Sequence, residues 1–388
     1  MRTLKKLLVL FILALPINTA MILSQETVNS GWVRAISWND SQNQIALVTQ
    51  SGSLSIISGL DGQLIHSWDR GDGQSLFSVE WNPSGTLLAV GGAEFLQIRN
   101  ESEVIYDLPV PRQNVLSLSW HPEGRLLASI SQDGYPNNAN IWDVVTGQLL
   151  YTLPAGEALS AAWSPDGNIL AITRIGEIQL WDVDSQQKLD VIPIPGYSLS
   201  MAWDINGTQI VSAEIDFPEQ FPVRIWDVAS HEVLQTFEGH TRSIPSVEWN
   251  HITNRIATGS IDGSVRIWDA ETGDLLELYQ TTDRVYGIDF SPFGGQLAIG
   301  MAPSQGMLIN APANTLASNN IQIVVPMPTF EELQAIFQAC EIPSLSETIN
   351  SLTQVTNLIT QLESLPTDAI PPACAADLIA VAEAIQNQ

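Results

Sequence analysis

Residues 115–153 read VLSLSWHPEGRLLASISQDGYPNNANIWDVVTGQLLYTL, and this stretch decides the fold. The segment that ends at Trp120 alternates apolar and polar residues, which is typical of a strand with one buried face. The sequence His121-Pro-Glu-Gly124 follows, and its proline and glycine favour a tight turn into an antiparallel partner. Further apolar runs lie at 126–129, 141–143 and 149–153. The stretch therefore predicts a four-stranded antiparallel meander.

The same unit recurs along most of the chain. A large aromatic residue, called the marker residue below, ends the first strand of each unit, at Trp38, Trp81, Trp120, Trp163, Trp203, Trp249 and Phe290. Successive markers are about 40 residues apart, which is a period typical of repeat architectures. Sheets that are apolar on both faces must stack on neighbours, and radial closure buries both faces of every sheet. We expect seven such blades around one axis.

The third strands carry a second signal, a Trp-Asp pair at 142–143, 181–182, 226–227 and 268–269, and a Gly239-His240 pair precedes the last of them. Together with the period, these features resemble WD-repeat propellers from about residue 30 to residue 318. The resemblance implies an all-β, seven-bladed β-propeller over residues 25–318, acting as a non-enzymatic protein-binding scaffold. The fold alone does not specify the function, because propellers carry many unrelated activities.

Three units depart from the pattern. The Trp-Asp pair is missing from the first, second and seventh units, which have Leu54–Ile57, Leu96–Arg99 and Met307–Asn310 at that place. The outer strand of the seventh blade could come from Ile321–Val325 or from Ile22–Val28, and the sequence does not choose between them.

Residues 1–24 have the anatomy of a secretory signal peptide. Three basic residues precede the apolar run Leu7–Ile17, and cleavage is expected near Ala20 or Ser24. The alternative is an uncleaved anchor, but an uninterrupted span of about 20 apolar residues is missing. We expect a secreted, periplasmic or cell-envelope protein without stable membrane insertion after cleavage.

The charge restricts the class of partner. The chain has 15 Lys and Arg against 42 Asp and Glu, with a formal net charge of −27. Nucleic-acid binders concentrate basic residues on one face, so a nucleic-acid partner is not expected. The sequence indicates a monomer that binds another protein, without a cofactor or a metal.

The tail, residues 319–388, has a different pattern. It contains no Lys or Arg, and apolar residues recur with the helical period after the capping box Thr329–Glu332. We expect three short helices joined by a disulfide between Cys340 and Cys374, which would stabilise the tail by roughly 3–4 kcal/mol. These are the two cysteines of the chain, so zinc–thiolate sites are not expected.

His240, Ser260 and Asp262, with Trp268 close behind, match the residue types of a hydrolase triad. Ser260 lacks the strand-to-helix elbow that exposes a nucleophile. The resemblance to WD-repeat proteins implies a buried hydrogen-bond network instead, in which Asp262 orients His240, Ser260 bonds its ring and the Trp268 indole is satisfied. No catalytic residue is predicted.

One face of the propeller is the expected partner surface, because the family binds partners on the loops that join second to third strands and blade to blade. Two of these loops are long and place aromatic residues beside proline, which suits binding hot spots. The alternative is that these rings fold back over neighbouring blades. The first strands also open onto this face at the positions four and six residues before the marker. The predicted partner-binding residues are Trp32, Arg34, Tyr135, Tyr197, Phe217, Phe221, Arg284 and Tyr286. We expect the first-strand residues among them to anchor an acidic or aromatic ligand.

Two other classes of function remain open. A propeller hydrolase or dehydrogenase would need His and carboxylates on several inner strands, which present mainly Ala, Ser, Leu and Val. A surface or structural protein would bind cations weakly through its acidic blades.

Overall fold

The computed structural model describes residues 21–22, 31–302, 315–316 and 321–324, with gaps at 40, 60–61, 111, 133–136, 282 and 293–294. The described chain folds entirely into β-strands and their connections. Within it, no helix is long and apolar enough to cross a membrane. The predicted tail helices, Cys340, Cys374 and the leader's first 20 residues lie outside the described residues.

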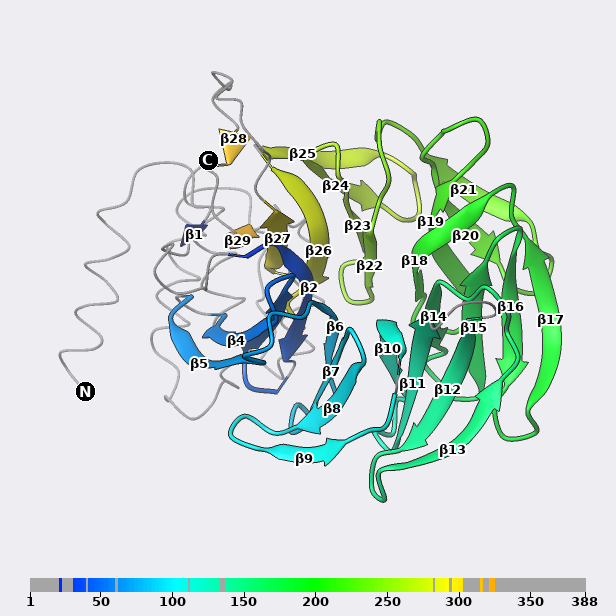
Figure 1. The fold of residues 1–388 in the computed structure, drawn as a ribbon. Helices are drawn as coiled ribbons and strands as arrows, with labels where there is room; N and C mark the ends of the chain where they lie inside the picture. The colour runs from blue at the N-terminus through cyan, green and yellow to red at the C-terminus, as the bar shows by residue number, and fades with distance from the viewer. Residues whose placement is uncertain are drawn as a thin grey trace, which may run out of the picture.

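Six blades are complete four-stranded antiparallel meanders, each made of consecutive strands (Figure 1). Blades 1 to 3 are β2 (Val33–Asn39), β3 (Gln44–Thr49), β4 (Ser53–Ser58), β5 (Leu64–Asp69); β6 (Leu76–Trp81), β7 (Leu88–Gly92), β8 (Phe95–Arg99), β9 (Val104–Asp107); and β10 (Asn114–Trp120), β11 (Leu126–Gln132), β12 (Asn138–Asp143), β13 (Gln148–Leu153). Blades 4 to 6 are β14 (Ser160–Trp163), β15 (Ile169–Arg174), β16 (Glu177–Asp182), β17 (Gln187–Pro193); β18 (Tyr197–Trp203), β19 (Gln209–Ile215), β20 (Val223–Asp227), β21 (Val233–Phe237); and β22 (Ser246–Asn250), β23 (Arg255–Gly259), β24 (Ser264–Asp269), β25 (Leu275–Thr281).

The seventh sheet is built differently. Its order is β26 (Arg284–Phe290), β27 (Leu297–Ala302), β29 (Ile321–Val324) and β1 (Met21–Ile22). The prediction of seven equivalent blades is therefore wrong: six are continuous meanders, and the seventh sheet takes its outer strands from two distant segments. β29 lies within the candidate segment Ile321–Val325 and fills the third position. β1 pairs outside it and shares only Ile22 with the candidate Ile22–Val28, whose other residues lie outside the described part of the chain. β1 and β29 stand just outside the predicted limits of 25 and 318.

A fifth strand extends blade 6. β28 (Thr315–Leu316) pairs in parallel with the outer strand β25. The chain thus adds backbone pairing to this blade's outer edge after leaving the seventh sheet.

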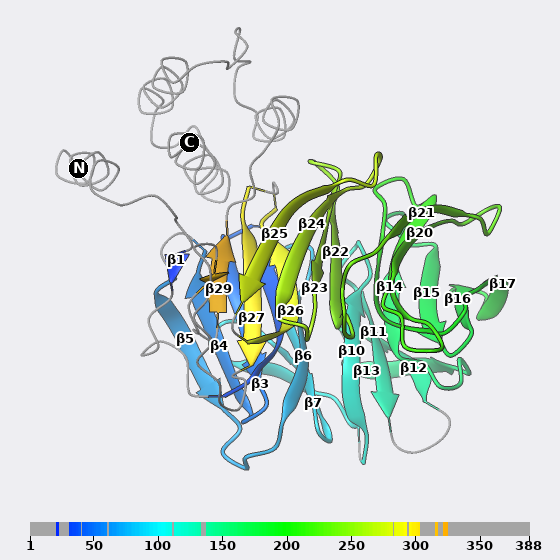
Figure 2. The same cartoon turned by 90° about the horizontal axis from the view of Figure 1, so that it is seen from above.

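The inner strands contact one another in a closed order, and β26 touches both β22 and β2 (Figures 1 and 2). The chain therefore forms a ring in which the seventh sheet packs against blade 1. A polar contact of this closure joins β26 to β2, where the backbone N–H of Trp38 donates to Oδ2 of Asp289 at 2.6 Å.

The marker tryptophans explain why neighbouring blades hold together. All six are buried in clusters that draw on adjacent sheets. Three of their indole N–H groups also donate across to the preceding blade: Trp120 to the carbonyl of Glu80, Trp163 to that of Ser119, and Trp203 to that of Ala162. A buried indole needs an acceptor, so this one residue type supplies both apolar area and an inter-blade hydrogen bond.

Candidate functional site

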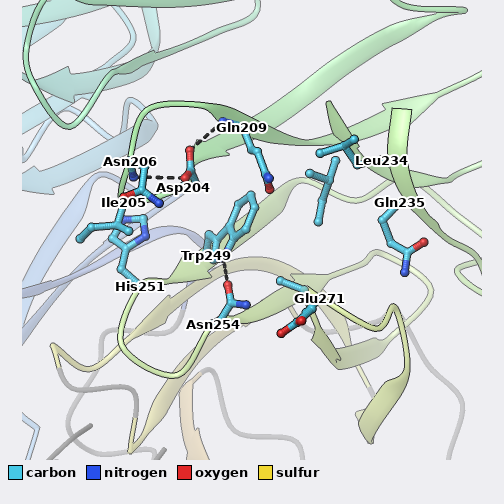
Figure 3. Close-up of a pocket in the computed structure, with 12 residues that line it drawn as sticks. Asp204, Ile205, Asn206, Gln209, Leu234, Gln235, Trp249, His251, Asn254 and Glu271 are labelled. Carbon is cyan, nitrogen blue, oxygen red and sulfur yellow. Dashed lines mark hydrogen bonds between the residues drawn. The ribbon is translucent and has the colours of Figure 1, made fainter. Parts of the chain in front are cut away.

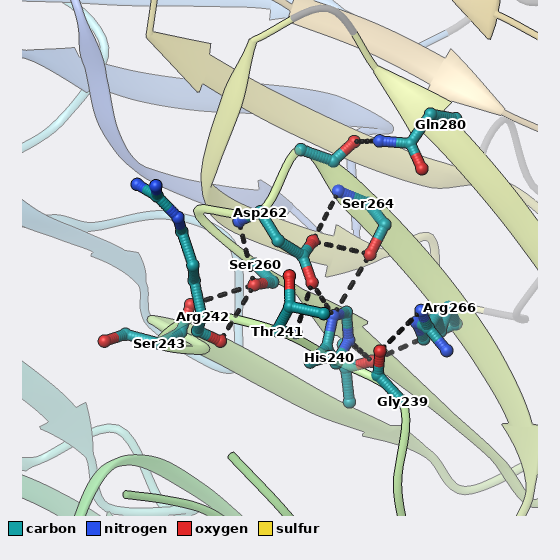
Figure 4. A network of polar contacts seen from close by, with 12 residues as sticks. Gly239, His240, Thr241, Arg242, Ser243, Ser260, Asp262, Ser264, Arg266 and Gln280 are labelled. Atoms are coloured by element: carbon teal, nitrogen blue, oxygen red, sulfur yellow. Dashed lines mark hydrogen bonds and ion pairs between the residues drawn. The ribbon is translucent and has the colours of Figure 1, made fainter. Parts of the chain in front are cut away.

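His240 lies in a hydrogen-bonded network at the start of blade 6 (Figure 4). Its Nδ1 is 3.0 Å from Oδ2 of Asp262, and its Nε2 is 2.8 Å from Oγ1 of Thr258. The Trp268 indole donates to the same Thr258 hydroxyl at 3.0 Å, and Ser264 bonds both His240 and Asp262. Thr258 is thus the hydroxyl that joins the His and Trp rings.

The role predicted for Ser260 is wrong. Its hydroxyl contacts the carbonyl oxygens of Arg242 and Ser243 and accepts the backbone N–H of Asp262. The reason is positional: Thr258 lies within β23, two residues after the residue paired with Trp268, whereas Ser260 lies beyond the strand in the turn. A fully buried hydroxyl held in this way is not placed for attack on a substrate.

The charges of the network follow from burial and hydrogen bonding. Burial lowers the pKa of His240, although Asp262 opposes the shift. Burial alone would raise the pKa of Asp262, but hydrogen bonds from His240, Ser264 and Thr241 outweigh it and hold this pKa well below its usual range. The Asp262 carboxylate thus orients a neutral His240 ring, and this hydrogen-bonded network makes the blade more rigid.

Other blades satisfy the equivalent tryptophan with other groups. Trp142 in blade 3 donates to Ser129, which matches Thr258 in position, and Trp181 in blade 4 donates to Gln179. In blade 5, Trp226 bonds Ser212 and Glu214. Because the acceptors of these indole N–H groups differ in residue type, the sequence indicated the Trp-Asp pairs but not the acceptors.

The residues four positions before each marker form a ring at the start of the inner strands, which we call the collar. In five blades this residue is the bulged one, between two register positions of the first strand pair. A bulge re-aims a side chain away from the ladder. All seven collar residues are half-buried, and six are apolar: Phe77, Leu116, Leu159, Leu199, Pro245 and Tyr286. The seventh is Arg34.

Arg34 lies between two aromatic collar residues. Its guanidinium carbon is 5.1 Å from the ring centre of Tyr286 and 5.8 Å from that of Phe77. The structure thus brings together Arg34 and Tyr286, two of the predicted partner-binding residues, and adds Phe77, which the sequence analysis missed. The signal for Phe77 was available, because it stands four residues before Trp81.

The other predicted partner residues divide into four groups. The positions two residues before the collar, which include Trp32, Tyr197 and Arg284, form the outer level of what we call the rim. Phe217 is 71% exposed and its ring lies 6.3 Å from that of Tyr197, so the loop after β19 contacts the rim beside the collar. Phe221 packs instead against the core between blades 5 and 6, as the alternative reading of the loop aromatics had it. Trp32 is half-buried and Arg284 is exposed at the outer level of the rim. Tyr135 lies outside the described residues.

Carboxylates line the inner strands one position before three markers, which the sequence analysis overlooked. Glu80 accepts the backbone N–H of Trp120, as Asp289 accepts that of Trp38. Burial raises the pKa of Glu80 to about 8, and the charge of Asp289 adds to the shift. Burial, with Asp289 and Glu80 nearby, also raises the pKa of Glu248 well above its usual value. Among the described residues, no group of three or more His, Cys, Asp or Glu has a geometry that could hold a metal ion.

A cavity of about 360 Å³ lies between blades 5 and 6, at the marker end of the inner strands (Figure 3). Trp249 lines it, and its indole N–H donates to Oδ1 of Asn254 at 3.1 Å. Asp204 at its edge accepts backbone N–H groups of its own turn, from Asn206, Thr208 and Gln209. This carboxylate therefore stabilises a hairpin turn, and the cavity lies at the opposite end of the strands from the collar.

Comparison with known proteins agrees with this architecture. The family model "WD domain, G-beta repeat" matches residues 231–269, which span the end of blade 5 and most of blade 6. A second model, "Anaphase-promoting complex subunit 4 WD40 domain", matches residues 79–161. The chain is a WD-repeat β-propeller protein.

Several curated proteins are similar to this WD-repeat chain. "Guanine nucleotide-binding protein subunit beta" of Oryza sativa subsp. japonica is 25% identical over 268 residues, which cover 65% of this chain and 59% of the relative. "WD repeat-containing protein AAC3" of Dictyostelium discoideum is 33% identical over 150 residues, covering 38% and 31%. "U3 small nucleolar RNA-associated protein 21 homolog" of Schizosaccharomyces pombe is 25% identical over 146 residues, covering 37% and 16%. The chain thus spans less than two thirds of each of these relatives.

Proposed function

We propose that this protein is a non-enzymatic binding platform that takes a protein partner on the face formed by the collar and the loop after β19. The observation that carries the proposal is the composition of this face. It gathers a ring of half-buried apolar side chains, two arginines and the exposed Phe217 in one place. Aromatic and arginine side chains that are held in place are the residue types of binding hot spots.

The polar residues that resemble a catalytic triad support the same conclusion. Ser260 is engaged with two backbone carbonyls, and Asp262 holds His240 against Thr258. Each group therefore has a structural role within blade 6, and none is oriented toward the collar by these contacts.

A site in the channel is the second candidate, because Glu80, Glu248 and Asp289 lie on three inner strands. Glu80 and Asp289, however, already bond the backbone of the next blade. Because these carboxylates tie inner strands together, we favour the platform over a hydrolase or dehydrogenase.

We further propose that the protein is exported, with its leader removed after Ala20. Processing there would keep Met21–Ile22, which form β1 of the seventh sheet, whereas processing after Ser24 would delete that strand. N-terminal sequencing of the exported protein should therefore begin at Met21. A first residue of Gln25, or an unprocessed Met1, would contradict this proposal.

Crosslinking in the native cells tests the platform. The variant with Trp32→Ala, Tyr197→Ala and Phe217→Ala should lose capture of the partner that the unaltered chain crosslinks. The control with Leu149→Ala and Leu150→Ala removes exposed apolar side chains from the outer strand β13 and should capture as before. Equal capture by both variants would contradict the proposed face.

A further inference from the structure

Arg34 is unusual among the arginines of this protein. It is half-buried, yet within the described part of the chain no ion pair or hydrogen bond engages its guanidinium. Other sheltered arginines are paired: Arg224 contacts Glu214 and Asp216, and Arg70 contacts Asp72 and the carbonyl of Ala93. A guanidinium carries five N–H donors, so Arg34 presents donors that await an acceptor.

The surroundings of Arg34 decide which acceptor fits. Tyr286 and Phe77 already lie within cation–π distance of the guanidinium. An aromatic ligand would have to compete with these two rings for the planar faces. The edge of the guanidinium remains, and its parallel N–H groups match the two oxygens of a carboxylate. The geometry therefore favours an acidic ligand over an aromatic one.

The charge around the collar favours the same ligand. In a chain with 42 acidic and 15 basic residues, the collar contains no acid. The positions two residues earlier, at the outer level of the rim, hold Arg284 and one acid, Glu157. These two sets of positions thus hold two arginines and one acid, in a chain with a formal net charge of −27. Complementary charge of this kind selects a partner and speeds its encounter.

We propose that the collar binds an extended segment of the partner in which an Asp or Glu side chain is flanked by apolar residues. This inference rests on the proposed function and adds the chemistry of the partner. The carboxylate pairs with Arg34, and the flanking apolar side chains lie against Leu116, Leu199 and Pro245 of the ring.

Peptide pools with randomised Leu, Val, Ile and Phe flanks test the proposal. Three pools have amidated C-termini and differ in the central residue, which is Glu, Gln or Lys. The full chain, immobilised, should retain the Glu pool at least about tenfold better than the other two, which corresponds to ~1.4 kcal/mol. Equal retention of the three pools, or retention of none, would overturn the proposal. A fourth pool, with central Gln and a free C-terminal carboxylate, detects recognition of a chain terminus, and preference for it alone would also overturn the side-chain assignment.

Substitutions at Arg34 locate the contact. Arg34→Leu should reduce retention of the Glu pool to the level of the Gln pool, and Arg34→Lys should retain part of it, because a single ammonium lacks the bidentate fork. Arg34→Leu should fold, since leucine occupies the equivalent position in blades 3, 4 and 5. Lys188→Gln, which removes an exposed positive charge from β17, is the matched control and should bind as the unaltered chain does. Unchanged Glu-pool retention by Arg34→Leu would overturn the assignment.

The two proposals can fail separately. If the collar face crosslinks a partner but the Glu pool has no advantage, the carboxylate chemistry is wrong and the platform stands. If the variant with Trp32→Ala, Tyr197→Ala and Phe217→Ala still captures the partner while the Glu pool is preferred, the peptide site is real but is not the partner surface.

Discussion

The backbone N–H of Trp38 donates to Oδ2 of Asp289 at 2.6 Å, and the two residues are 251 positions apart in the chain. Equivalent contacts recur around the ring, where Ser37 accepts the N–H of Trp81 and Ser119 that of Trp163. A side chain one position before a marker thus ties its blade to the next. The Asp289 contact joins the seventh sheet to blade 1.

Removing this contact should open the ring closure. Asp289→Ala is expected to lower the free energy of unfolding by about 1.5–3 kcal/mol, because the acceptor is charged. Ser37→Ala removes the neutral counterpart between blades 1 and 2 and should cost about 1 kcal/mol. Urea unfolding measures both, and an equal or smaller loss in Asp289→Ala would show that this bond does not carry the closure.

In the network of blade 6, Thr258 is the common partner of two rings, so we expect it to contribute more to stability than Ser129, its counterpart in blade 3. Thr258→Val keeps the shape but leaves His240 Nε2 and the Trp268 indole without their common partner. We expect a loss of about 2–4 kcal/mol, against about 1–3 kcal/mol for Ser129→Ala, which leaves one indole unpaired. Denaturant titration of the two variants decides, and a smaller cost at Thr258 would contradict the shared role.

Glu80 predicts a pH dependence of stability. Burial raises its pKa from the ordinary 4.5 to about 8 in the folded protein, so the fold favours the protonated form. The contribution of this group to stability is complete below pH 4.5 and is lost as the pH rises through about 8. The melting temperature should therefore fall between about pH 5 and pH 9, and Glu80→Gln should flatten that fall. Glu232→Gln changes an exposed acid and should leave the profile unchanged; an identical profile for Glu80→Gln would refute the assignment.

Blade 5 replaces the histidine network with an ionic one. Glu214 has no exposed side-chain surface and contacts Arg224, which also pairs with Asp216. Arg224→Met should cost about 3–5 kcal/mol, because it leaves a buried carboxylate without its cation. Adding Glu214→Gln should recover part of the loss. Arg174→Met breaks a more exposed pair and should cost less than about 1 kcal/mol, so similar losses at the two sites would contradict the account.

Much of the fold was predictable because blade packing imposes a repeat. Each marker must fill the same space between two sheets, so Trp38 to Phe290 recur at a regular period. The seventh sheet was not predictable in full, since β29 and β1 are short and join it by strand pairing, β29 with β27 and β1 with β29, rather than through a motif of their own. Thr258 was missed because the acceptor carries no motif of its own: Thr258, Ser129 and Ser212 hold equivalent positions in three blades, while blade 4 uses Gln179.

The candidate site was predictable in its positions but not in its contacts. Counting back from the markers located Arg34 and Tyr286, since inner strands present the same positions to the same rim. The bulges that re-aim these side chains leave no sequence signature, so the stacking of Arg34 between Tyr286 and Phe77 required coordinates. The same holds for Phe221, whose neighbour Pro222 resembles that of the exposed Phe217, while its ring packs into the core.

The most direct test of the binding face is site-specific photo-crosslinking in the cells that make the protein. A photoreactive residue at Leu199, in the collar, should yield a discrete adduct with another protein, and the yield should drop when Arg34→Leu is added. The same residue at Leu150, on the outer strand β13, should yield no such adduct. An adduct from Leu150 with none from Leu199 would contradict the proposal that partners bind at the collar.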